Sequence, residues 1–149
     1  MQLKKLVVQH NSCFTSLAAD TTLDQALRVL VRHGKTAVVV LDGGKIIGIL
    51  TRTDVVKALE DGGLAPPGEQ TVAQMMTREL VSSEPQTSFD HALDCMAQSH
   101  IEHLPVIEEG RLLTVIHESD LLRGRINALE AEIKQLHEYI DNLHNATQD

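Results

Sequence analysis

Aromatic residues are nearly absent from this chain, which has one Tyr, two Phe and no Trp among 149 residues. Its core must therefore be built from aliphatic side chains, and 42% of the residues are hydrophobic, which is enough for one. The length fits one compact domain or two small subdomains. Cysteine is also scarce. Cys13 and Cys95 make no disulfide framework, and neither lies in a metal-binding or redox pair.

Basic residues are outnumbered, with 13 Lys and Arg against 21 Asp and Glu, for a net charge of −8. Because binding to a phosphate backbone requires a basic surface, we expect no nucleic-acid partner. A small anion held by local donors is not excluded. No apolar run approaches the roughly 20 residues of a membrane span, and the apolar start of the chain is too short for a signal peptide. We expect a cytoplasmic protein with no membrane partner.

One pattern of strand, tight turn, strand and polar cap occurs twice, at an offset of 66 residues. The first copy runs from Val38 to Asp54 and the second from Leu104 to Asp120, and no gap is needed to align them. Both turns contain glycine, which readily adopts a positive φ. A repeated unit has to bury its apolar face, and the other copy is the obvious partner. We therefore expect a site between two halves of one module.

Each copy is predicted to be a β-α-β-β-α unit, which gives an α+β fold. Apolar residues recur at helical spacing from Leu23 to Val31 and from Phe89 to Ala97. Thr22 and Ser88 precede these helices as N-caps. The expected strands are 14–16, 36–41 and 46–50 in the first copy and 80–82, 103–107 and 112–116 in the second. A further helix is expected to begin at 53–54 in the first copy and at 119–120 in the second.

The predicted division of the chain is 5–60 for repeat one, 61–70 for a linker, 71–124 for repeat two and 125–145 for a C-terminal helix. The linker is rich in Gly and Pro, which interrupt regular structure. Repeat two begins with a short helix at 71–76, and the corresponding segment before repeat one, 5–10, matches it poorly.

The C-terminal helix carries an unbroken heptad stripe with Ile at every a position and Leu at every d position. This pattern favours a parallel two-stranded coiled coil, and therefore a homodimer. Arg125 and Glu130 are placed to pair across such a dimer. Gly124 is a weak point, costing about 1 kcal/mol in a helix interior, where the coil is expected to bend away. The alternative is an amphipathic helix folded back on its own domain. The stripe consists of Leu122, Ile126, Leu129, Ile133, Leu136, Ile140 and Leu143.

Residues 5–126 resemble a tandem pair of cystathionine-β-synthase (CBS) domains, a Bateman module. The stretch Gly48–Asp54 matches the family's pattern of glycine, two apolar residues, Thr or Ser, two variable residues and Asp. His103–Val106 is similar to the family's apolar-Pro-Val strand, and Met76–Glu79 to the start of its second repeat. The resemblance implies two repeats about a pseudo-two-fold axis with two clefts between them. It also implies a regulatory module that pairs with a second one and binds AMP, ADP, ATP, NAD or S-adenosylmethionine.

The chemistry of such a ligand indicates which residues would bind it. A carboxylate can accept hydrogen bonds from both hydroxyls of a ribose, and Asp54 and Asp120 are the candidates. A phosphate would bind Thr51 and Arg52 at a helix N-terminus, and the adenine edge would face the backbone near Thr15 and Thr36. The full set of candidates is Thr15, Ser16, Thr36, Ala37, Val38, Thr51, Arg52, Asp54, Ser82, His103, Leu104, His117 and Asp120.

The two clefts are not equivalent in sequence. In the second copy Gly48 becomes Thr114, Thr51 becomes His117, and Arg52 becomes Glu118. A side chain at 114 is expected to crowd a phosphate and Glu118 to repel it, while His117 could donate to it, especially when protonated. We therefore expect the Thr51 and Asp54 cleft to be the main site, and the other to be empty or to take a less charged ligand. Thr51 and Asp54 also form a capping box, and capping alone would explain both residues.

No catalytic motif is present, since the chain lacks a nucleophile elbow and a P-loop. Its eight histidines form no His-Glu-x-x-His motif, and we predict neither catalysis nor a metal or catalytic cofactor. Two interpretations of function remain. One is an adenine-nucleotide sensor whose ligand rearranges a homodimer and acts on an unknown effector protein. The other is a ligand-free dimeric adaptor that works through its coiled coil.

Overall fold

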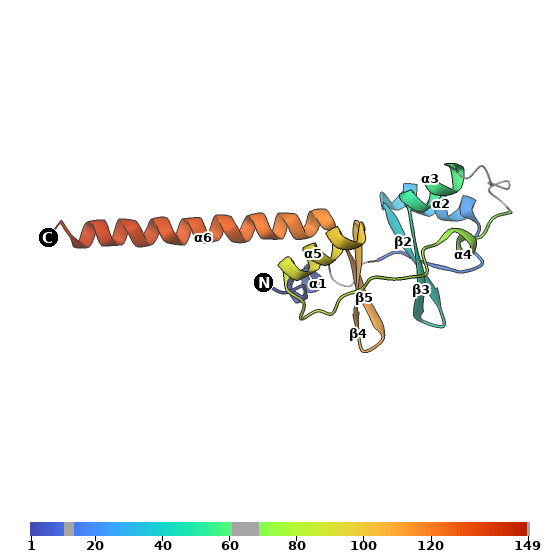
Figure 1. Ribbon diagram of the computed structural model, residues 1–149, viewed down its shortest axis with the longest axis horizontal. Coiled ribbons are helices and arrows are strands. Elements are labelled where there is room, and N and C mark those ends of the chain that lie inside the picture. The colour runs from blue at the N-terminus through green and yellow to red at the C-terminus, as the bar shows by residue number, and fades with distance from the viewer. Residues whose placement is uncertain (11–13, 61–68, 149) are drawn as a thin grey trace.

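The computed structural model describes residues 1–10, 14–60 and 69–148 and contains two lobes and a long projecting helix (Figure 1). Cys13 lies outside these ranges, and so does most of the linker expected at 61–70. The elements in chain order are α1 (Lys4–His10), β1 (Ser16–Ala18), α2 (Leu23–His33), β2 (Ala37–Asp42), β3 (Lys45–Thr51), α3 (Arg52–Glu60), α4 (Val72–Met75), α5 (Phe89–Ser99), β4 (His103–Glu108), β5 (Arg111–His117) and α6 (Glu118–Ala146).

The two hairpins confirm the repeated α+β unit. In repeat one, β1 pairs in parallel with β2, and β2 pairs antiparallel with β3. In repeat two, β4 pairs antiparallel with β5. Both hairpins carry a register irregularity at the same place, after Val40 in β2 and after Val106 in β4. The two positions are 66 residues apart, so the repeat extends to this detail of strand pairing.

The leading strands differ from those expected at 14–16 and 80–82. Strand β1 begins at Ser16, and repeat two has only a single bridge there, between Ser83 and Val106. The backbone beyond Ser83 bonds to the start of the chain instead of to β4. The Pro85 carbonyl accepts from the Lys4 N–H at 2.8 Å, and the Thr87 carbonyl accepts from the Leu3 N–H at 2.9 Å. This competing pairing explains why the second leading strand is not extended.

The segments that precede the repeats pack on the opposite lobes. Leu3 and Leu6, next to and within α1, are buried with Phe89 and Leu104 in the core of repeat two. Val72 of α4, together with Met76, is buried in the core of repeat one. A third cluster around Val39, Ile49 and Leu112 joins the two sheets. The boundaries 5–60 and 71–124 of the two repeats stay a prediction. The packing does not follow them, because α1 packs on repeat two and α4 packs on repeat one.

Helix α6 both closes repeat two and forms the C-terminal extension as one helix of 29 residues. The helix runs through Gly124, so the glycine does not end it, and the bend expected there stays a prediction. A Cβ added there would lie 2.5 Å from Cε2 of Phe89, so glycine lets α5 and α6 approach closely. Arg125 Nε lies 3.3 Å from Asp90 Oδ1 of the same chain, so Arg125 already has a partner besides the Glu130 expected across a dimer.

The heptad stripe of α6 is not folded back on the domain. Its seven side chains are 43–60% exposed, and the helix projects away from both lobes (Figure 1). The fold-back alternative is therefore wrong, whereas the coiled coil stays a prediction. No helix in the described part of the chain is both long and apolar enough to cross a membrane.

Candidate functional site

The ends of the two hairpins meet at the junction of the lobes. Ala37 at the start of β2 lies opposite Thr51, and His103 at the start of β4 lies opposite His117. Thr36 Oγ1 and His103 Nε2 are 2.7 Å apart and form a hydrogen bond between the two repeats. Polar strand ends from both repeats are therefore gathered at one edge of the module.

A cleft of about 140 Å³ lies at this junction. Six of the predicted site residues line it, namely Thr15, Thr36, Ala37, His103, His117 and Asp120. Thr15 and Thr36 of repeat one therefore lie in the same cleft as His117 and Asp120 of repeat two, at the start of α6, and that cleft is not lined by Asp54. The two sheets contact each other through β3 and β5.

Asp120 is anchored at this cleft but retains acceptor capacity. Its Oδ2 accepts from the His117 N–H at 3.3 Å and lies 3.7 Å from His10 Nε2. Its Oδ1 lies 3.9 Å from Arg123 Nη1. The side chain is 23% exposed, and a carboxylate has about four lone-pair sites for hydrogen bonds. One short-range hydrogen bond therefore leaves room for a ligand donor.

The two histidines of the cleft have different tasks. His117 caps α6, because its Nδ1 accepts from the Ser119 N–H at 3.1 Å. Its ring meets that of His103 edge-on, with centroids 4.9 Å apart. Burial, aided by nearby His117 and Arg52 and opposed by Glu102, lowers the pKa of His103 to about 4. His103 is therefore neutral near pH 7 and binds Thr36 as an uncharged partner.

The carboxylate of Asp54 is already occupied by the protein. Its Oδ2 accepts from the Thr51 N–H at 2.8 Å and from the Thr51 hydroxyl at 3.2 Å. Its Oδ1 accepts from the Thr77 hydroxyl at 2.8 Å. These contacts support the capping interpretation of Thr51 and Asp54, and Asp54 does not line the cleft described above. Thr77 lies in the Met76–Glu79 stretch that resembles the family, but no sequence pattern indicated this contact.

The expectation that a side chain at position 114, in place of the glycine at 48, would crowd a phosphate is wrong. The space beside Gly48 is filled by Met76, whose Cγ would lie 2.8 Å from an added Cβ, so glycine makes room for protein and not for a phosphate. Thr114 is fully buried, so its side chain cannot crowd a ligand.

Besides Thr51 and Asp54, five predicted residues lie outside the lining of this cleft. The side chains of Val38 and Leu104 are buried in the cores of repeats one and two. Ser16, Arg52 and Ser82 are exposed.

Sequence reasoning missed five other residues that line the cleft, which are His10, Phe14, Lys35, Val39 and Val115. His10 could not have been found, because α1 crosses to the other lobe. In the described ranges, no three His, Cys, Asp or Glu side chains are placed to hold a metal ion. That the protein takes no metal stays a prediction.

The sequence profile of the CBS domain matches residues 10–61 and 72–127. The CBS domain-containing protein YhcV of Bacillus subtilis is 29% identical over 106 residues, which cover 71% of this chain and 74% of that protein. A CBS-domain protein of Agrobacterium tumefaciens has a solved structure with a TM-score of 0.78 and 30% identity, over 84% of this chain and 99% of that one.

Two further proteins are similar to this chain. The CBS domain pair of protein MJ0100, solved with 5-methylthioadenosine and S-adenosyl-L-methionine, has a TM-score of 0.73 at 21% identity, over 86% of this chain and 98% of that one. An A-adding tRNA nucleotidyltransferase of Geobacter sulfurreducens is 33% identical over 108 residues, 72% of this chain but only 12% of that enzyme. CBS domains are mostly regulatory, and some are parts of much longer enzymes. This chain belongs to the CBS-domain family, as a tandem pair of repeats with a C-terminal helix.

Proposed function

We propose that the chain is a regulatory module that binds an adenosine-containing ligand in the cleft between Thr36 and Asp120. The observation that carries this proposal is that five other predicted residues from both repeats gather around the partly open carboxylate of Asp120. The adenosine ligands of the MJ0100 domain pair support the ligand class. The cleft of Asp54 has less support, because Thr51 and Thr77 already occupy that carboxylate.

The lining of the cleft suits the parts of an adenosine. Phe14 and Val115, both partly buried, offer apolar surface for the base, and backbone groups at Thr15 and Ala37 would read its edge. Asp120 would accept hydrogen bonds from the two ribose hydroxyls. His103 is neutral near pH 7, so it adds no positive charge that would favour an anionic ligand over a neutral one.

Ligand binding would be transmitted through α6. Asp120, Arg123 and Asn127 follow at spacings of three and four residues, so they share one face of this helix. The stripe that begins at Leu122 and Ile126 lies on another face, because successive residues turn by about 100° in a helix of 3.6 residues per turn. A ligand on Asp120 therefore acts on the same rigid element that would form the dimer. The ligand can shift the equilibrium between two arrangements of the dimer only by the difference in its affinity for them.

The test is a thermal-shift and calorimetric screen of the full chain against adenosine, AMP, ADP, ATP, NAD and S-adenosylmethionine. At a hundredfold excess over Kd, a bound ligand stabilises by about 2.7 kcal/mol, which is readily measured. We expect Asp120→Asn to remove the shift. Asp54→Asn should lower the melting temperature of the free protein and keep the shift. If Asp54→Asn loses binding and Asp120→Asn does not, the ligand binds at Thr51 and Asp54, as expected from the sequence.

A second candidate function rests on the exposed stripe of α6. If no adenosine compound binds, a dimeric adaptor acting through this helix is the remaining interpretation. Its partner would then be lost when the residues after Arg125 are removed.

A further inference from the structure

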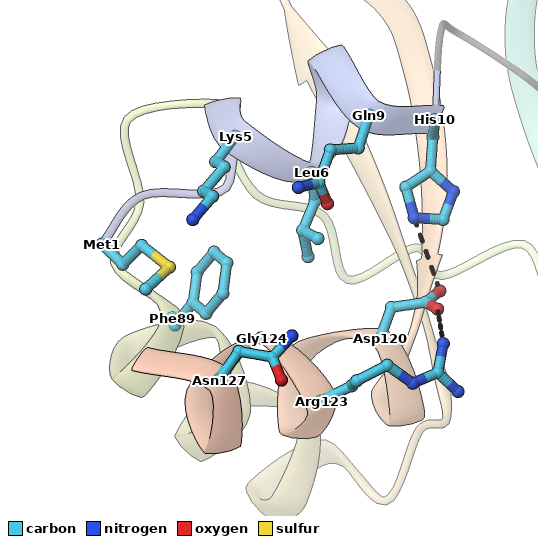
Figure 2. A pocket seen from close by; sticks show the side chains of 10 residues that line it. All are labelled: Met1, Lys5, Leu6, Gln9, His10, Phe89, Asp120, Arg123, Gly124 and Asn127. Carbon is cyan, nitrogen blue, oxygen red and sulfur yellow. Dashed lines mark ion pairs between the residues drawn. The ribbon is translucent and has the colours of Figure 1, made fainter. Parts of the chain in front are cut away.

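A second hollow adjoins the cleft on the other side of Asp120. It has a volume of about 260 Å³ and lies between α1 and the first turns of α6 (Figure 2). Leu6 and Phe89 form its apolar base. Lys5 and Gln9 from α1 and Asn127 from α6 reach into it from opposite sides, as Figure 2 shows. We call this hollow the α1–α6 groove.

The groove and the cleft share two residues, His10 and Asp120. The cleft alone, at 140 Å³, is small against the roughly 300–1,000 Å³ of typical small-molecule sites, whereas the cleft and the 260 Å³ groove together fall within that range. A ligand with its ribose at Asp120 would therefore need to continue past this residue to fill a site of ordinary size.

The groove is locally basic in an acidic chain. Lys5 and Arg123 line it, and of the described residues that do so Asp120 is the one carboxylate. That carboxylate is already close to His10 and Arg123. The amides of Gln9 and Asn127 add neutral donors. Lysine, arginine and amide donors together suit the oxygens of a phosphate chain.

We propose that the α1–α6 groove holds the part of the ligand beyond the ribose, and that this part is a chain of at least two phosphates. The inference rests on the proposed function, because the groove is placed relative to a ribose at Asp120. It narrows the ligand class to adenosine diphosphates, triphosphates and compounds that contain an adenosine diphosphate. Lys5 is the residue that would select them over adenosine.

The experiment measures Kd by calorimetry for adenosine, AMP and ADP on the full chain. Because a charge-assisted hydrogen bond contributes roughly tenfold or more in affinity, we expect ADP to bind at least that much more tightly than adenosine. Lys5→Gln should remove most of this gain and leave adenosine binding unchanged. Lys4→Gln is the matched control, since Lys4 is the preceding residue of α1, makes the same charge change and does not line the groove.

Three outcomes are distinguishable. Equal affinity for adenosine and ADP, or equal losses of ADP affinity in Lys5→Gln and Lys4→Gln, would contradict the binding of a phosphate chain in the groove. The proposed function would still stand. No binding of any adenosine compound would overturn the proposed function itself. Asn127→Ala is the second variant, from the opposite wall. We expect it to weaken ADP more than adenosine, and a loss of the same size for both ligands would contradict the inference.

Discussion

His103 shows how a single side chain ties the two repeats together. Its ring stands edge-on to His117 within repeat two, and its Nε2 is bonded to Thr36 of repeat one. Burial is the main cause of its low pKa, and the nearby His117 and Arg52 side chains lower it further. The contact between the repeats therefore depends on a neutral imidazole.

We predict that stability falls as the pH is lowered from about 6.5 to about 4, the interval between the ordinary pKa of histidine and that of His103. In this interval the unfolded chain binds a proton that the folded chain does not, so stability is fully present above it and decreases below. The loss is on the order of 1 kcal/mol after allowing for the partial exposure of the ring. Urea unfolding at pH 4.5, 5.5, 6.5 and 7.5 measures it.

His103→Gln should flatten this pH dependence, because an amide still bonds Thr36 but does not titrate in the interval. His91→Gln is the control, since His91 is exposed on α5. If wild type and His103→Gln lose stability in parallel, the neutral imidazole is not the cause.

At the scale of elements, the packing of α5 on α6 fixes where the long helix leaves the domain. Phe89 lies against Gly124, and Asp90 pairs with Arg125 one residue further along each helix. The sequence identified Gly124 as a weak point on helix propensity alone. The structure shows a close contact between helices, because an aromatic ring occupies the space of the missing side chain.

We predict that Gly124→Ala destabilises the protein, contrary to the usual gain of about 1 kcal/mol when alanine replaces glycine in a helix. Overpacking against Phe89 costs roughly 1–3 kcal/mol, so a net loss of up to about 2 kcal/mol is expected. Urea denaturation of both proteins measures it. Phe89→Leu combined with Gly124→Ala tests the cause, because the two changes should be less than additive in cost. An increase in stability for Gly124→Ala alone would refute the contact.

At the scale of the whole molecule, crossed connections tie the lobes into one module and α6 extends from it. Because α1 packs on repeat two and α4 on repeat one, neither lobe has a complete core without the segment that precedes the other repeat. The stripe of α6 is a large apolar surface that this arrangement leaves exposed. Ile at a and Leu at d suit a parallel pair of such helices.

We predict a dimer in sedimentation equilibrium, held together by α6. Ile133→Asp places a charge at a central a position and should raise the dissociation constant at least tenfold, roughly the effect of 1.4 kcal/mol. Gln135→Asp is the control, because it also adds one negative charge but lies at a c position outside the stripe. A monomeric wild type, or equal effects of the two changes, would contradict the coiled coil.

Local patterns were predictable because they depend on near neighbours in the chain. The capping of α2 by Thr22, the two hairpins and the long amphipathic helix all follow from spacings of two to seven residues. The pairing of cleft residues was not predictable in this way. Sequence spacing ranks Asp54 above Asp120, because only the first copy keeps the full family pattern.

The sequence by itself determined the repeat, the α+β units, the family and the heptad stripe. The tertiary structure alone decided which carboxylate is open to a ligand. Thr77, in the segment after α4, donates a hydrogen bond to Asp54. His10 lies close to Asp120 at the end of α1, the helix that packs on the lobe of repeat two. Both partners are distant in sequence from the caps they touch, so no local periodicity encodes them, and only the packed chain brings each to its carboxylate.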